Sequence, residues 1–308
     1  MPSSPQILAL GEAMVEFNQA RPGEATWLQG FGGDTSNAVI AAARAGARTG
    51  YLTRVGDDAF GRMLLDLWAR EGVDTSAVEV VAGGETGLYF VSHGPQGHAF
   101  SYRRAGSAAA RMTPDWLTGA PLAALRDSQW LHVSGISMAI SPTACQTTLA
   151  AMRAARAAGV RVAFDSNLRL KLWSREAAAA AYELALPLTD LFLPSLDDMT
   201  ALCGLTDADA VVDWAHARGA GQVVVKLGDH GALVSEDGRR HRLDALPAMV
   251  VDATGAGDCF AGNLLARLVA GDALLGAARY ANAAASLTVQ GFGAVAPLPR
   301  ADAVRALL

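Results

Sequence analysis

Short apolar runs alternate with longer segments of helical spacing along most of the chain. Six runs rich in apolar or β-branched residues predict strands, at 7–10, 50–55, 130–135, 160–165, 191–195 and 223–228. Several of these runs are apolar at consecutive positions, which is typical of parallel strands buried on both faces. Apolar residues recur with a helical period between them, at 36–46, 59–72, 142–159 and 175–186. This alternation predicts an α/β fold, a doubly wound and mainly parallel sheet with helices on both faces.

Two stretches, 12–31 and 86–104, break this alternation. In each of them apolar and polar residues alternate around turn residues, which predicts an antiparallel hairpin inserted between α/β units. Together the two hairpins could form a small second sheet. Two interpretations stay open: surface hairpins without a function, or a lid over an active site. We therefore expect one domain, 1–308, that carries a small β-sheet lid.

Composition and charge exclude several classes of function. The chain has 308 residues, 51% of them hydrophobic, which is enough for a large core. A net charge of −5 without a basic tract argues against a nucleic-acid partner. Three distant cysteines suggest neither a disulfide framework nor a zinc cluster. No signal peptide and no membrane-spanning apolar run is recognisable, so we expect a soluble cytoplasmic protein that acts on a small molecule.

The segment DATGAGDCFAGN, residues 252–263, places an aspartate at the predicted start of a helix. A dinucleotide fingerprint fails because Phe260 replaces a required glycine, and a P-loop fails because Asn263 stands where lysine is required. A tight Gly-Ala-Gly turn remains, whose free N–H groups and positive helix end suit developing phosphate charge. Asp258 fits either a first-turn acid that stabilises the helix dipole or a general base in phosphoryl transfer. We favour the general base.

Two motifs near opposite ends of the chain resemble the signatures of one family. DATGAGDCFAGN resembles the C-terminal signature of the ribokinase-like (PfkB) carbohydrate kinases, and GGDTSNAVIAAARAG, residues 32–46, resembles their N-terminal glycine signature. The resemblance covers essentially the whole chain. It implies a doubly wound α/β fold with a β-sheet lid, with ATP and Mg²⁺ as cosubstrates. Lid sheets often pair between subunits in this family, which makes a homo-oligomer through the lid a further expectation.

The resemblance also implies roles for residues in the two motifs. Asp258 matches the family's catalytic base, and the anion hole matches the backbone of Gly255, Ala256 and Gly257. Taken alone, residues 32–46 fit a plain strand-to-helix turn in which Ser36 caps the helix. With the resemblance, the expected ligands of the sugar hydroxyls are Gly33, Asp34 and Asn37.

The nucleotide side of the site is less defined by the sequence. The family uses a glycine-bounded loop near adenosine and phosphates, and the matching segment here is VVVKLGDHG, residues 223–231. Lys226 fits this role or that of a solvated lysine at a strand end. The expected ATP-binding residues are Asp165, Asn167, Ser195, Lys226, Gly228, Gly231, Gly255 and Gly257.

Cation binding departs from the family pattern at one place. Many relatives carry an N-x-x-E motif that governs Mg²⁺ and phosphate, whereas this chain has Ser195 and Asp198 at the matching positions. Both still offer oxygen ligands, so Asp198 is the expected metal ligand and the detailed role of the metal stays open. A monovalent cation near Asp252 and Thr254 is left open as well.

The substrate prediction depends on residues of the inserted strands and of one strand end. Tyr89, Tyr102 and Arg104 fall on the inserted strands, and Arg169 follows the strand that ends at Asp165, at the edge where α/β proteins bind ligands. Two arginines at one small pocket favour a carboxylate, which a guanidinium binds through two hydrogen bonds. Pairing with acidic side chains, or contact with ATP phosphates alone, is the alternative.

The segments YRRAGSAA and DSNLRLKLW resemble in particular the 2-keto-3-deoxygluconate kinases of the family. We therefore favour ATP-dependent phosphorylation of this sugar acid to its 6-phosphate. A fructokinase or another sugar kinase is the alternative, and a non-catalytic sugar-binding regulator a more distant one.

Overall fold

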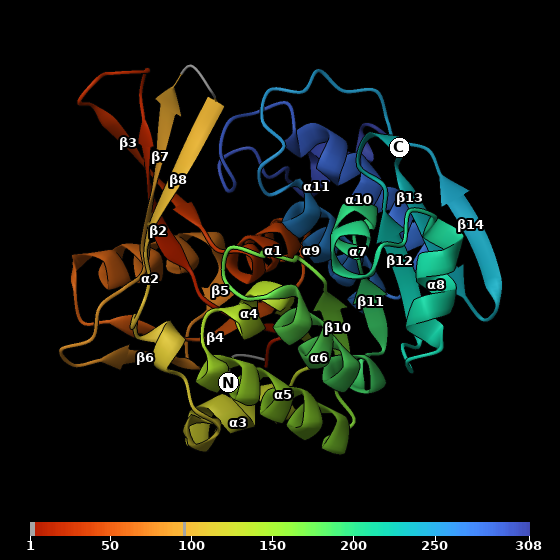
Figure 1. The fold of residues 1–308 in the computed structure, drawn as a ribbon, viewed down its shortest axis with the longest axis horizontal. Helices are drawn as coiled ribbons and strands as arrows, with labels where there is room; N and C mark the ends of the chain where they lie inside the picture. The colour runs from red at the N-terminus through yellow and green to blue at the C-terminus, as the bar shows by residue number, and fades with distance from the viewer. Residues whose placement is uncertain (1–3, 95–96) are drawn as a thin grey trace.

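A ten-stranded sheet forms the centre of the computed structural model, which describes residues 4–94 and 97–308 (Figure 1). Its neighbouring strands are parallel except in the two pairs at one edge, β12–β13 and β13–β14. A short strand, β6 (Val78–Val81), pairs with β4 outside the main order. From that edge the order is β14 (Arg239–Leu243), β13 (Ala232–Glu236), β12 (Gln222–Lys226), β11 (Leu191–Leu193), β10 (Arg161–Asp165), β9 (Trp130–Ser134), β1 (Ile7–Leu10), β4 (Thr49–Gly56) and β5 (Val73–Asp74).

Helices cover both faces of this sheet, which explains why its strands are apolar at consecutive positions. In β1, Leu8 and Leu10 pack into the core on one face, whereas Ile7 and Ala9 pack into the cores on the other. The first face is covered by α3 (Gly119–Arg126), α4 (Gly135–Ala139), α5 (Pro142–Ala157), α6 (Arg175–Ala185), α7 (Leu196–Cys203) and α8 (Ala208–His216). The second face is covered by α1 (Asp34–Arg44), α2 (Ala59–Glu71), α9 (Ala256–Val269), α10 (Leu274–Thr288) and α11 (Ala301–Arg305).

A four-stranded sheet stands off this body, in the order β3 (Trp27–Gly32), β2 (Met14–Gln19), β7 (Leu88–Gly94) and β8 (Gly97–Arg103). It is the lobe at the upper left of Figure 1, with β2 and β3 in red and β7 and β8 in orange to yellow. Two antiparallel hairpins, β2–β3 and β7–β8, are joined through the parallel pair β2–β7. The predicted fold class is confirmed: the six predicted strands, the four predicted helices and both inserted hairpins are present.

The start of α1 differs from the expected cap. The helix begins at Asp34 and Gly33 occupies its N-cap, without a capping side chain. Ser36 instead accepts a hydrogen bond of 2.9 Å from the indole nitrogen of Trp68, so the Ser36 cap was wrong. Gly33 has φ 122°, and a Cβ there would lie 2.5 Å from the carbonyl oxygen of Glu12. Only glycine fits this turn.

Helix length and polarity bear on membrane contact. No helix in the described part of the chain is both long and apolar enough to cross a bilayer.

Candidate active site

The two glycine motifs of the sequence meet at Asp258. Gly255 caps α9 in the left-handed conformation, at φ 78°, and packs so closely on Ala294 that a Cβ would lie 3.0 Å from the carbonyl oxygen of that residue. Asp258 is the third residue of the helix that this turn starts. Its Oδ2 accepts a hydrogen bond of 2.8 Å from Nδ2 of Asn37, in α1. Residues 221 positions apart are thereby joined at one carboxylate.

The surroundings of Asp258 raise the pKa of its carboxyl above the usual value for an aspartate. Burial raises the pKa of this carboxyl to about 7, and the negative charges of Asp34 and Asp165 add to the effect. The hydrogen bond from Asn37 and the charge of Lys226 act in the opposite direction. A carboxyl with a pKa near neutrality can accept a proton from a hydroxyl and release it again.

Two buried oxygens near Asp258 have no hydrogen-bond partner among the residues that the structure describes. Asp34, the first residue of α1, accepts a hydrogen bond of 2.9 Å at Oδ2 from Nδ2 of Asn167, but its Oδ1 is unpaired within the described chain. The Oδ1 of Asn37 is likewise buried and unpaired there. Buried polar atoms usually have a hydrogen-bond partner, so these oxygens are suited to the hydroxyls of a bound ligand.

Lys226 lies close to the first turn of α9. Its ammonium donates to Oδ2 of Asp165 at 2.5 Å, and it lies 3.4 Å from where a Cβ on Gly257 would be. The lysine side chain is mostly buried, unlike a solvated lysine at a strand end. Burial raises the pKa of Asp165, and the charge of Lys226 opposes this rise. A positive charge therefore stands beside the positive end of a helix, an arrangement that favours an anion.

The backbone of the Gly-Ala-Gly turn is only partly free for an anion. The N–H of Ala256 donates to the carbonyl of Ala253 at 3.2 Å, within the turn itself. No side chain caps the helix. The N–H groups of Gly257 and Asp258 belong to the first turn, where a helix supplies no backbone partner. Of the three predicted backbone groups, Gly257 is thus better placed to meet an anion than Ala256.

The loop after β12 contains the other two predicted glycines. Gly228 and Gly231 both have positive φ and bracket a short 3₁₀ turn, Gly228–His230. Ser195 caps α7, since its hydroxyl accepts a hydrogen bond of 3.1 Å from the N–H of Asp198. The backbone of Ser195 also pairs with that of Lys226. Ser195 is thus committed to the helix end, which its spacing alone did not reveal.

Asp198, the predicted metal ligand, already accepts hydrogen bonds from protein groups. Its Oδ2 accepts hydrogen bonds from the Ser166 hydroxyl at 2.6 Å and from the N–H of Leu168 at 3.1 Å. Its charge contributes to the raised pKa of Asp165, so the two carboxylates are close. Among residues 4–94 and 97–308, no three His, Cys, Asp or Glu side chains are grouped to hold an ion.

Two tyrosines of the small sheet stack on each other. Tyr89 in β7 and Tyr102 in β8 are paired across the strands, with ring centroids 6.0 Å apart. The Tyr89 hydroxyl donates to Glu16 of β2 and would collide with a Cβ on Gly32. Tyr102 is partly exposed. The pair presents aromatic and hydroxyl groups next to the glycine turn that precedes α1.

The two predicted arginines differ in their surroundings. Arg104 is nearly buried and donates through Nε to Oε2 of Glu12 at 2.7 Å, so it pairs with an acidic side chain. Arg169 is exposed and donates to the carbonyl of Leu168 at 2.9 Å. No acidic partner of Arg169 lies within the described chain. Only Arg169 is therefore free of competition from a protein carboxylate.

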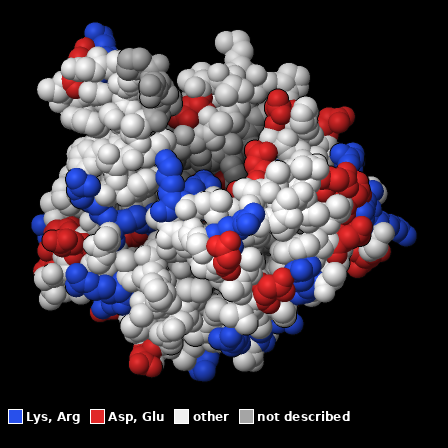
Figure 2. Space-filling view, in the orientation of Figure 1, with Lys and Arg blue, Asp and Glu red and all other residues white. Residues whose placement is uncertain are grey.

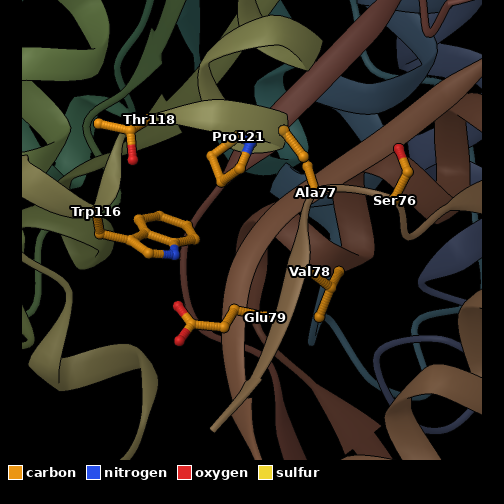
Figure 3. Close-up of a pocket in the computed structure, with 8 residues that line it drawn as sticks. Ser76, Ala77, Val78, Glu79, Trp116, Thr118 and Pro121 are labelled. Carbon is orange, nitrogen blue, oxygen red and sulfur yellow. The ribbon is translucent and has the colours of Figure 1, made fainter.

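The surface between the small sheet and the body is hollowed. Figure 2 shows this hollow below and to the right of the upper-left lobe, with Lys and Arg side chains gathered along its lower edge. A second depression, of about 340 Å³, lies elsewhere, between β6 and the segment that leads into α3 (Figure 3). Trp116, Pro121 and Glu79 line it, and Glu79 is paired with Arg54. It contains none of the predicted site residues.

Sequence reasoning missed two carboxylates of the small sheet and its base. Glu12 and Glu16 are both buried, at 1% and 6% exposure, and both accept hydrogen bonds from groups of the site, Arg104 and Tyr89. In the alternating pattern GEAMVEF they occupy positions that usually face solvent. The available signal was their spacing of four residues beside the predicted lid.

Comparison with known proteins gives one family. Residues 4–301 match the model of the family described as pfkB family carbohydrate kinase. The 2-dehydro-3-deoxygluconokinase of Escherichia coli strain K12 is 36% identical over 310 residues, which cover 96% of this chain and 98% of the relative. A fructokinase of Klebsiella pneumoniae is 34% identical over 270 residues, which cover 86% of this chain and 85% of the relative.

Solved structures agree over the full fold. A PfkB protein from Polaromonas sp. JS666 matches with a TM-score of 0.89 at 31% identity, over 98% of this chain and 100% of that one. A fructokinase with bound ATP from Xylella fastidiosa matches with a TM-score of 0.89 at 26% identity, over 98% and 97% of the two chains.

Proposed function

The chain belongs to the pfkB family of carbohydrate kinases, and on this premise we propose that it phosphorylates 2-keto-3-deoxygluconate at its 6-hydroxyl with ATP. The identity of 36% to a kinase named for this sugar acid, across nearly the full length of both chains, carries the proposal. The arginines at the strand end and at the base of the small sheet support it, because a guanidinium recognises a carboxylate.

Asp258 is the general base of the proposed reaction. Its carboxylate takes the proton of the sugar's 6-hydroxyl, whose oxygen attacks the γ-phosphorus of ATP. The bond from that phosphorus to the β–γ bridging oxygen breaks, and ADP leaves. Asn37 holds the carboxylate through its bond of 2.8 Å, so the lone pair that accepts the proton points in a fixed direction.

Lys226 and the start of α9 stabilise the negative charge on the γ-phosphoryl group during its transfer. Lys226, held by Asp165 at 2.5 Å, and the first turn of α9 place a positive charge and free N–H groups together. Gly228 and Gly231 shape the neighbouring loop for the nucleotide. Mg²⁺ bound with ATP would neutralise phosphate charge, and the carboxylate that would hold it is Asp198, which also accepts hydrogen bonds from Ser166 and Leu168.

The sugar acid is held by the body and by the small sheet. The unpaired oxygens of Asp34 and Asn37 accept hydrogen bonds from its hydroxyls, behind the Gly33 turn. Arg104 and Arg169 bind its carboxylate. In this proposal the small sheet is a lid, which excludes water from the phosphoryl group when it closes.

A fructokinase is the second candidate, and one observation favours it. Arg104 is already neutralised by Glu12, so only Arg169 offers an uncompensated charge to a substrate. The fructokinase of K. pneumoniae is nearly as similar, at 34% identity.

We also propose that two copies of the chain associate through their small sheets. Leu28 on β3 and Phe100 on β8 are 55% and 45% exposed, on the two edge strands of a sheet that can pair or pack with a second copy. Light scattering on the wild type and on Phe100→Glu tests this. A dimer that becomes monomeric in the variant supports it, and a wild-type monomer at micromolar concentration refutes it.

The experiment that tests the function measures ADP release from ATP and Mg²⁺ with a panel of acceptors. The panel contains 2-keto-3-deoxygluconate, gluconate, fructose and ribose. We expect the keto-deoxy acid to be turned over most efficiently, with the phosphate on its 6-oxygen by phosphorus NMR. Highest efficiency with fructose supports the second candidate instead, and no ADP release with any acceptor contradicts both.

A further inference from the structure

Glu12 is a buried carboxylate at the base of the small sheet, between β1 and β2. It is 1% exposed. Its Oε2 accepts the Nε–H of Arg104 at 2.7 Å and lies 2.5 Å from Nη2 of the same guanidinium. Its other oxygen, Oε1, accepts a hydrogen bond from the Ser107 hydroxyl. Both oxygens are therefore paired with groups from the segment that follows β8.

The chain passes between the body and the small sheet at four places, and Glu12 lies in or close to each of them. It stands itself in the first connection, from β1 to β2. In the second, from β3 to α1, a Cβ on Gly33 would lie 2.5 Å from its carbonyl oxygen. In the third, from β6 to β7, a Cβ on Gly87 would lie 2.7 Å from its Oε1. In the fourth, after β8, are Arg104 and Ser107. The Glu12 carboxylate is thus hydrogen-bonded to the fourth connection and packed closely against the third, while the Glu12 backbone lies against the second.

The ion pair determines which part of Arg104 remains available. Glu12 occupies the Nε side of the guanidinium, and the plane of that group follows from this contact because a guanidinium is rigid and flat. Nη2 lies beside the same carboxylate oxygen but is buried without a hydrogen bond, and Nη1 makes no hydrogen bond to the described residues. Arg104 is also nearly buried, at 10% side-chain exposure, so without Glu12 its charge would be buried without a counter-ion.

We propose that Glu12 is a positioning residue for substrate specificity: it fixes Arg104 at the root of the small sheet so that the free Nη1 edge meets the carboxylate of the substrate. The substrate's charge and the position of the small sheet are then linked through one ion pair. This inference rests on the proposed sugar-acid kinase function, since it assigns Arg104 to the carboxylate.

A double-mutant cycle tests the coupling between the two residues. Glu12→Gln keeps the shape of the side chain and its hydrogen bond to Ser107 but removes the charge that orients Arg104. We expect the KM for 2-keto-3-deoxygluconate to rise about tenfold or more, with a much smaller change in kcat, because a charge-assisted contact is misplaced in substrate binding. In the Arg104→Leu background the same substitution should add less than about twofold to KM, since its target is gone.

Stability measurements distinguish positioning from simple support of the fold. Arg104→Leu leaves the Glu12 carboxylate buried without its counter-ion, with only the Ser107 hydrogen bond remaining, so the Tm of this variant should fall by about 5 °C or more. Adding Glu12→Gln should restore much of that loss. The matched control is Glu71→Gln, which breaks another mostly buried arginine–glutamate pair, Arg44–Glu71, on α1 and α2. It should lower Tm and leave the KM for the sugar acid unchanged.

Three results would overturn the inference. The first is a Glu12→Gln variant that loses stability but keeps the wild-type KM. The second is a pair of KM effects that simply multiply in the double variant. The third is an equal rise of KM in Glu71→Gln. If the wild type prefers a neutral sugar, the proposed function fails before any variant is made. The double-mutant cycle is then evaluated from the Tm values, and the pairing of Glu12 with Arg104 still requires that their effects on Tm are not additive.

Discussion

Replacing Asp258 by asparagine separates a catalytic from a structural role for this carboxyl. The amide has nearly the same shape, and its oxygen can still accept the hydrogen bond of 2.8 Å from Asn37. It cannot accept a proton. We expect kcat to fall by about 10²–10⁴, the usual contribution of a general base, while the dissociation constant of ATP stays within about twofold because no nucleotide contact is removed.

The same substitution should stabilise the fold, by an amount that follows from the pKa. Burial raises the pKa of Asp258 to about 7 from 3.8, and the ionised group therefore opposes folding above neutrality. A shift of about three units corresponds to at most about 4 kcal/mol, and the gain should be smaller because the titration of Asp258 depends on the neighbouring carboxylate of Asp34.

The pH dependence of this gain has a definite sign. Between about pH 4 and pH 7 the folded protein holds a proton that the unfolded chain has lost, so the free energy of unfolding of the wild type falls as pH rises. Asp258→Asn removes that contribution. The variant should thus gain over the wild type at pH 8, and the gain should shrink toward pH 4.

Urea unfolding at pH 4.5 and pH 8, with steady-state ADP release and ATP titration calorimetry at pH 8, provides the test. Asp34→Asn is the comparison for the unfolding measurements only, since it removes a neighbouring carboxylate without removing the base, whereas its turnover should also change because Asp34 is a proposed ligand of the sugar hydroxyls. Near-normal turnover in Asp258→Asn would refute the assignment of the base. A variant that is inactive and also less stable at pH 8 would show that the carboxylate serves the fold.

The other predictions concern pH, the arginines and the small sheet. In the wild type, kcat/KM should rise with pH through about 7, because Asp258 must lose its proton to act as a base. Asp34→Asn should move this rise to lower pH, since the charge of Asp34 raises the pKa of Asp258. A rise at the same pH in the variant would contradict this influence of Asp34. Arg169→Leu should lower kcat/KM for the sugar acid by about tenfold or more and that for fructose little; equal loss on both would assign Arg169 to ATP. Amide exchange in β7 and β8 should slow when the sugar acid binds, if the small sheet closes as a lid; unchanged exchange at saturation would make it a surface hairpin pair.

Much of the fold was predictable because its signals are local. Runs such as 160–165 are apolar at consecutive positions, and the structure buries β10 almost completely. The antiparallel edge pair, β13 and β14, was not predicted. Its outer strand, RRHRL, is mostly exposed and carries three arginines, so periodicity could not separate it from a loop. Sheet order was also outside the reach of local patterns, since β1 lies between β4 and β9, which come later in the chain.

The candidate site was predictable where a motif determines backbone geometry, and not where side chains pair over long distances. Asp258 and the Gly255 turn belong to one local motif, and the structure places them at a helix start. The pairing of Glu12 with Arg104 joins residues 92 positions apart, and that of Lys226 with Asp165 joins residues 61 apart. Such partners follow from sheet order, so only the folded structure reveals them.

The central claim, that the substrate is an acidic sugar, depends most directly on one ratio. It is kcat/KM for 2-keto-3-deoxygluconate divided by kcat/KM for fructose, measured on the wild type at saturating ATP and Mg²⁺. Two charge-assisted contacts of about 1.5–3 kcal/mol each predict a ratio of roughly 10² or more, since about 1.4 kcal/mol is tenfold. A ratio at or below one would contradict the claim and make this chain a kinase of neutral sugars.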